Sequence, residues 1–243
     1  MKFEEEFQNA FGMMEPSFFI FLYWSDNMKH QELLKRIIPE LRADQSITAV
    51  MLMGSVAAET ENPYSDLNLF ILGSKNKLQT EQMDGITVEY LYITQEAAQS
   101  KLDKSPSAVY YYFGSKIIYD LDGRLIKLMR SAMNKYKKYK ANEKDKLELR
   151  QYLMSARSKI NAAIYLKDFL RADYITATTT DKLIEAVFAL NDIPLPPVSK
   201  MFHELPNLRH IPDPVWFENL YNNNTKRRTE SIISAIDWAL DLI

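Results

Sequence analysis

Two short apolar runs in the first third of the chain constrain its fold more than any other feature. The runs Ile47–Met53 and Asp66–Leu72 are rich in strand-forming residues and are short for helices. A third run, Ile86–Ile93, follows the turn sequence Met83-Asp84-Gly85. These segments predict neighbouring strands, and therefore a sheet, in the front half of the chain.

Helical periodicity surrounds these strands and fills the back half. Apolar residues recur at helical spacing over 33–41, ahead of the first strand, and the pattern is helical again from Arg124 onward. We expect Asn142 to cap a long helix that runs to about Leu170, and a further helix over 180–190. The sequence predicts an α+β fold. A small mixed sheet flanked by helices occupies residues 1–140, and an all-helical bundle domain follows over residues 141–243.

Composition and charge exclude several classes of function. The 243 residues include no cysteine, which excludes disulfides and thiolate metal sites. The formal net charge of -2 argues against a protein that coats nucleic acid, so we expect no nucleic-acid partner.

The most apolar short run, Ser17–Trp24, is too short to cross a bilayer as a helix, and it follows an acidic start. We therefore expect no membrane partner and a cytoplasmic location. One interpretation of this run is core packing or a subunit contact, which would make the protein a homodimer. The other is an aromatic surface on which a base or an aglycone stacks.

The second predicted strand carries two polar residues, Asp66 and Asn68, among leucines. Successive strand residues point to opposite faces, so Asp66 and Asn68 share one face and Leu67 and Leu69 the other. If the leucines face a core, the polar pair faces outward. Glu89 in the third strand would lie near Asp66 if the two strands are neighbours.

Two carboxylates and an amide oxygen form an all-oxygen ligand set, which suits a hard cation and Mg²⁺ in particular. Mg²⁺ sites are usually completed by water and substrate phosphates. The Gly54-Ser55 pair at the end of the first strand fits that chemistry. Glycine lets main-chain N–H groups approach a phosphate, and the serine hydroxyl adds a donor.

These residues resemble the nucleotidyltransferase superfamily that includes DNA polymerase beta, and most closely its bacterial members that modify aminoglycoside and lincosamide antibiotics. The family pattern is an apolar strand, Gly-Ser, a loop, Ser-Asp-x-Asp on a strand and a third carboxylate on a later strand. Here the same order reads MLMGSVAAETENPYSDLNLFIL and then ITVEYLYI. The helical segment LIEAVFALNDIPLPPVSKMFHELP resembles the substrate domain of such enzymes.

The resemblance implies a nucleotidyltransferase fold with specific residue roles. Asp66 would bridge the metal ions, Asn68 would be a weak metal ligand, and Glu89 would bind the acceptor-side metal or take the acceptor proton. The implied nucleotide-binding residues are Gly54, Ser55 and Ser65. The implied cofactor is Mg²⁺, with Mn²⁺ as a substitute. The implied partners are a nucleoside triphosphate and a small hydroxyl-bearing acceptor.

Two positions depart from the family pattern. Glu59 stands where the family often has glycine, and Asn68 stands where it has the second metal-binding aspartate. A dication and a unit charge about 4 Å apart attract by roughly 8 kcal/mol at an effective dielectric of about 20, although desolvation offsets most of this. An amide oxygen can coordinate Mg²⁺ but lacks that formal charge.

Three functions therefore remain open. The first is Mg-dependent transfer of a nucleoside monophosphate to a hydroxyl of a small molecule, with release of pyrophosphate. The second is a catalytically weakened nucleotide-binding or regulatory protein of the same fold. The third is a toxin–antitoxin component, against which the long helical second half argues. No P-loop motif is present, and the three histidines are too scattered to form a recognisable site.

Overall fold

The computed structural model describes residues 28–243, so the Ser17–Trp24 run lies outside the described residues. The chain divides into two compact units, Met1–Lys135 and Tyr136–Ile243. Among the described residues, no helix is both long enough and apolar enough to traverse a bilayer.

The first unit is built on a five-stranded mixed sheet with strand order β3-β4-β2-β1-β5. The central pair, β2 and β4, is parallel, and every other neighbouring pair is antiparallel. The strands are β1 (Ile47–Met53), β2 (Leu67–Gly73), β3 (Lys77–Met83), β4 (Ile86–Ile93) and β5 (Lys116–Asp120). The predicted mixed sheet with flanking helices is confirmed.

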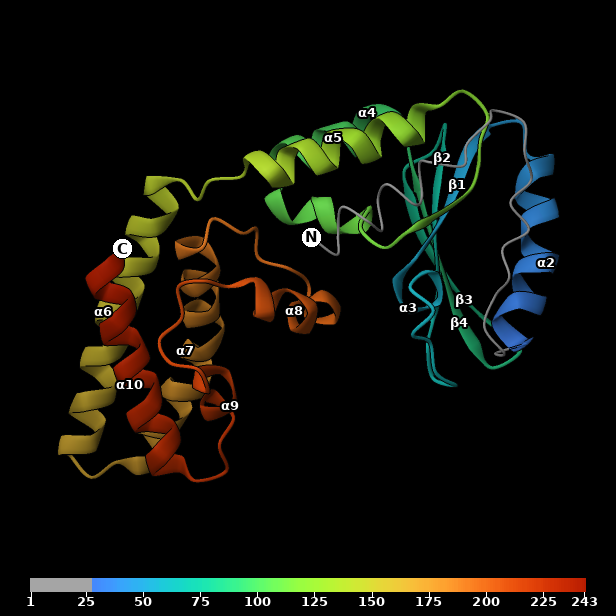
Figure 1. The fold of residues 1–243 in the computed structure, drawn as a ribbon. Helices are drawn as coiled ribbons and strands as arrows, with labels where there is room; N and C mark the ends of the chain where they lie inside the picture. Colours follow the sequence, from blue (N-terminus) through green and yellow to red (C-terminus); the bar gives the residue numbers. More distant parts are fainter. Residues whose placement is uncertain (1–27) are drawn as a thin grey trace. The chain divides into compact units, whose positions relative to one another are not determined.

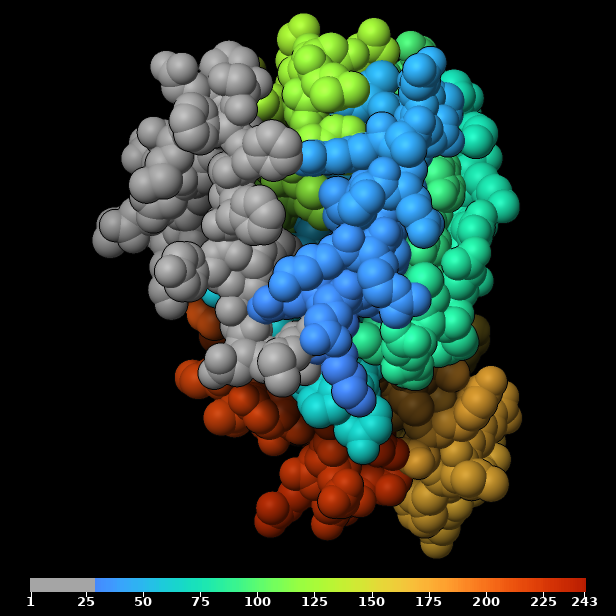
Figure 2. Space-filling view, turned by 90° about the vertical axis from the view of Figure 1, so that its right-hand side faces the viewer, coloured from blue at the N-terminus to red at the C-terminus, as the bar shows by residue number. Residues whose placement is uncertain are grey.

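Helix α2 (Met28–Ala43) covers one face of this sheet (Figure 1). Its apolar side packs on alternate residues of the inner strands, including Val50, Leu67 and Leu69. The helix contributes Leu33, Leu34, Ile37 and Leu41 to this core. Its polar side lies at the surface, in blue in Figure 2. The spacing of apolar residues in the sequence therefore identified the buried side of α2 correctly.

On the other side of the sheet from α2 lie α4 (Gln95–Lys104) and α5 (Arg124–Lys138), with the 3-10 helix η1 (Pro106–Tyr111) between them in the sequence (Figure 1). The ring of Phe70 on β2 meets that of Tyr112 edge-on, with ring centroids 5.6 Å apart. Burial raises the pKa of the Tyr112 hydroxyl well above its ordinary value, so this ring remains neutral at physiological pH.

The outer strand β3 has a different character from the other four. Its sequence, KLQTEQM, is mostly exposed, and β4 is its one strand neighbour among residues 28–243. It joins β4 through a turn in which Asp84 and Gly85 both have positive φ. Because no apolar face is present, the sequence pattern did not predict this strand.

The second unit contains only helices and their connections. They are α6 (Glu143–Tyr165), α7 (Phe169–Leu190), α8 (Val198–Glu204), η2 (Leu205–Asn207), α9 (Trp216–Leu220) and α10 (Thr225–Leu242). Asn142 caps α6 as predicted, because its side chain accepts from the Asp145 N–H. The predicted run to Leu170 is wrong. Lys167 adopts a left-handed φ of 58°, and Asp168 then caps α7.

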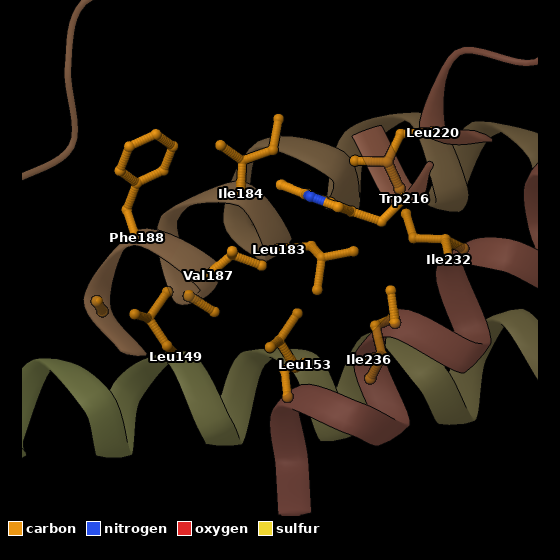
Figure 3. Packing of buried hydrophobic residues seen from close by; sticks show 14 of the residues in the cluster. Leu149, Leu153, Leu183, Ile184, Val187, Phe188, Trp216, Leu220, Ile232 and Ile236 are labelled. Atoms are coloured by element: carbon orange, nitrogen blue, oxygen red, sulfur yellow. The ribbon is translucent and has the colours of Figure 1, made fainter. Parts of the chain in front are cut away.

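Three long helices and the short α9 enclose one apolar core in this unit (Figure 3). Helix α6 contributes Leu149 and Leu153, and α7 contributes Leu183 and Val187, among others. Trp216 of α9 closes one side of the cluster and is 4% exposed. The packing of these side chains stabilises helices whose own propensities would not hold them together.

We predict that Leu153→Ala lowers the free energy of unfolding of the second unit by about 2–5 kcal/mol, because Leu153 is fully buried and its truncation leaves a cavity. The matched control is Leu147→Ala on the same helix, where the side chain is 54% exposed. That change should cost less than about 0.5 kcal/mol. Urea unfolding followed by tryptophan fluorescence measures both, and equal effects would contradict the assigned core.

Candidate functional site

The end of β1 turns sharply at Gly54, which has a φ of 74°. The short helix α3 (Gly54–Ala57) starts at this residue. A Cβ at position 54 would lie 3.2 Å from Nδ2 of Asn68 on β2. Position 54 therefore needs glycine for two reasons, because an L side chain would be strained there and would also press on Asn68.

Asn68 and Glu89 are brought together by the sheet. They are register partners on the parallel strands β2 and β4, and Met53 at the end of β1 is the register partner of Asn68 on the other side. Register partners point to the same face of a sheet. Since Leu67 and Leu69 face α2, Asn68 and Glu89 lie on the opposite face, and both are half-buried.

Asp66 lies immediately before β2 and is also half-buried. It precedes Asn68 by two residues, so the sequence-predicted ligands Asp66, Asn68 and Glu89 come from one end of β2 and from the adjacent position of β4. Gly54 borders the same location through its approach to Asn68. Positions from three separate regions of the sequence thus lie at one end of β2 and on the strands beside it.

Ser65 is held inside the loop that precedes Asp66. Its hydroxyl oxygen accepts from the Asn62 N–H at 2.9 Å, and its own N–H donates to the Asn62 carbonyl at 2.9 Å. The hydroxyl proton is still able to donate to a further acceptor. Ser55 has a structural contact as well, because its carbonyl accepts from the Thr60 N–H at 3.0 Å.

Glu59 adopts a left-handed backbone conformation, with a φ of 57°. That conformation favours glycine, which gives a physical reason for the glycine often found at this position in the resembling family. The Glu59 carboxylate forms an ion pair with Lys116 of β5. Lys116 is the register partner of Leu52 near the end of β1, so the structure adds an ion pair beside β1 that the sequence did not indicate.

The chemistry of these side chains fits a hard divalent cation. The set Asp66, Asn68 and Glu89 offers oxygen ligands of the kind that Mg²⁺ accepts, and water and phosphate oxygens usually complete the coordination of Mg²⁺. Within the described part of the chain, no group of three or more His, Cys, Asp and Glu side chains could hold a metal by itself. A metal at this site would therefore depend on Asn68 or on ligands from a substrate.

No family model and no curated protein matches the sequence. Among solved structures, the chain is similar to a nucleotidyltransferase-like protein from Exiguobacterium sibiricum, with 11% identity and a TM-score of 0.46. The alignment covers 87% of this chain and 74% of that one. At this distance the similarity does not assign the chain to a family.

We predict that Gly54→Ala lowers the free energy of unfolding by more than backbone strain alone would. The matched control is Gly123→Ala, because Gly123 has nearly the same φ (71°) and nothing within 4 Å of an added Cβ. Each change should lower the free energy of unfolding by about 1–2 kcal/mol through backbone strain. Gly54→Ala should cost more, because Asn68 must also move.

Chemical denaturation of the two variants side by side measures the difference. Equal losses of stability would show that Asn68 does not constrain position 54.

Proposed function

We propose that this chain transfers a nucleoside monophosphate from a nucleoside triphosphate to a hydroxyl group of a small molecule and releases pyrophosphate. The observation that carries the proposal is the parallel register of Asn68 with Glu89, two residues after Asp66 on the same strand segment. The approach of Gly54 to Asn68 supports the same location for the triphosphate.

The reaction we propose is an in-line displacement at the α-phosphorus. The acceptor hydroxyl oxygen forms a bond to that phosphorus, the bond to the bridging oxygen breaks, and pyrophosphate leaves. Mg²⁺ bound at the site would neutralise charge on the phosphate oxygens. Asp66 would hold the metal ions, Asn68 would add a weaker ligand, and Glu89 would accept the acceptor proton or hold the acceptor-side metal.

The Gly54-Ser55 turn would hold the triphosphate. A glycine with positive φ has no side chain to keep the phosphates away from the main-chain N–H groups. The Ser55 and Ser65 hydroxyls are half-buried and each has a proton to donate. Mn²⁺ accepts the same oxygen ligands and should substitute for Mg²⁺.

A second function is favoured by one specific observation, the amide at position 68. Without the formal charge of an aspartate, the site would hold its nucleotide-side metal more weakly, and the chain could bind a nucleotide without transferring it. Such a protein would be a nucleotide-binding or regulatory member of the same fold.

An acceptor screen separates the two functions. The protein is incubated with each labelled nucleoside triphosphate, with Mg²⁺ or Mn²⁺, and with hydroxyl-rich compounds that include aminoglycosides and lincosamides. Release of pyrophosphate that depends on an acceptor supports the transferase. Tight nucleotide binding without release supports the binding protein, and absence of both contradicts both functions.

We predict that Asp66→Asn abolishes Mg²⁺-dependent nucleotide binding, because it removes the carboxylate at the centre of the proposed ligand set. The control is Asp103→Asn, an equal change of charge on the surface of α4, where Asp103 forms an ion pair with Lys135. Isothermal titration with a nucleoside triphosphate and Mg²⁺ measures both variants. Native affinity in Asp66→Asn would remove Asp66 from the site.

We predict that Asn68→Asp strengthens Mg²⁺ binding about tenfold or more, since the amide oxygen becomes a charged ligand and tenfold corresponds to only about 1.4 kcal/mol. Asn76→Asp is the matched control. It adds the same charge elsewhere in the first unit and keeps the oxygen that accepts from the Thr94 N–H. Equal Mg²⁺ affinity in native protein and Asn68→Asp would contradict the role given to the amide.

A further inference from the structure

The loop that carries Ser65 is bonded to a side chain far away in the sequence. Nε2 of His30, in the first turn of α2, lies 2.9 Å from the Ser65 carbonyl oxygen. A carbonyl oxygen only accepts, so Nε2 carries the proton and donates. The His30 side chain is 1% exposed and Ser65 is half-buried, so this is a partly buried hydrogen bond between α2 and the residue immediately before Asp66.

We propose that His30 is a positioning residue for the candidate site: its hydrogen bond to the Ser65 carbonyl sets where the Asp66 carboxylate lies. This inference rests on the function proposed above. His30 itself does not touch the substrate in this account, because α2 covers the face of the sheet that contains Leu67 and Leu69. Asn68 and Glu89 lie on the other face.

The internal bonding of the loop explains why one anchor is effective. Asn62 and Ser65 bond to each other twice, and the Tyr64 N–H donates to the Asn62 side chain at 2.9 Å. Residues 62–65 therefore form a small self-bonded turn that can move as one piece. On one side it continues through Asp66 into β2, and the His30 bond fixes it to α2 at a second point.

The other nitrogen of the His30 ring, Nδ1, indicates which property of the ring the loop requires. Within residues 28–243, Nδ1 of His30 has no hydrogen-bond partner. The observed polar contact of the ring is made through Nε2, so the position requires only an N–H donor. A glutamine side chain of similar length can supply that donor from its amide. Leucine fills comparable space without any donor.

Three variants test the proposal. His30→Leu removes the donor, His30→Gln retains one, and Tyr119→Phe is the matched control at the other end of α2. The Tyr119 hydroxyl donates to the Leu41 carbonyl at 3.2 Å, away from the site. Each variant is compared with native protein in amide hydrogen exchange over residues 60–66 without nucleotide. Affinity for a non-hydrolysable triphosphate analogue with Mg²⁺ is then measured below the unfolding temperature of every variant.

We expect His30→Leu to exchange faster over residues 60–66 and to bind the Mg²⁺–nucleotide analogue about tenfold or more weakly, as is usual for residues that orient a metal ligand. His30→Gln should recover most of both properties. Tyr119→Phe should change neither, although it also removes a bond to α2.

Three results would overturn the role of His30 alone: unchanged loop exchange in His30→Leu, faster exchange with native nucleotide affinity, or equal damage in His30→Gln and His30→Leu. Failure of the native protein to bind any nucleotide analogue with Mg²⁺ is a different result. It would overturn the proposed function, and the positioning role would be overturned with it.

Discussion

The position of β2 between β1 and β4 is the constraint on which the rest of the first unit depends. Hydrogen bonding to both neighbours fixes its register, and burial of Leu67 and Leu69 under α2 fixes which face each side chain takes. Because strand side chains alternate, a slip of one residue would turn the leucines outward and Asn68 into the core. The contacts that stabilise the sheet therefore also position the candidate site.

Much of this arrangement could be predicted from the sequence. The bounds of β1 and β4 were predicted as the structure has them, because both strands combine apolar residues with clear breaks on either side. Strand β3 was not predicted, since its edge position demands no apolar face. The break between α6 and α7 was also missed. It depends on a left-handed Lys167, a conformation that residue type alone does not indicate.

In the candidate site, too, features set by neighbouring residues could be predicted, and contacts between residues far apart in the sequence could not. The spacing of Asp66 and Asn68 is local, and it predicted that Glu89 would lie near Asp66 if two particular strands were neighbours. The structure shows that β2 and β4 are neighbours and that Glu89 is the register partner of Asn68. Contacts made across long sequence separations were not predictable. His30 reaches Ser65, and Lys116 reaches Glu59, only because helices and strands from separate parts of the sequence pack together.

The polar edge strand β3 has a consequence for how molecules of this protein meet one another. An open sheet edge offers unpaired main-chain groups on which a second polypeptide can add as a further strand. On β3 this edge is lined by exposed Lys77 and Glu81 with glutamines around them, so an approaching chain would have to desolvate charges to pair there. The sheet can thus end at β3 without inviting intermolecular β-aggregation.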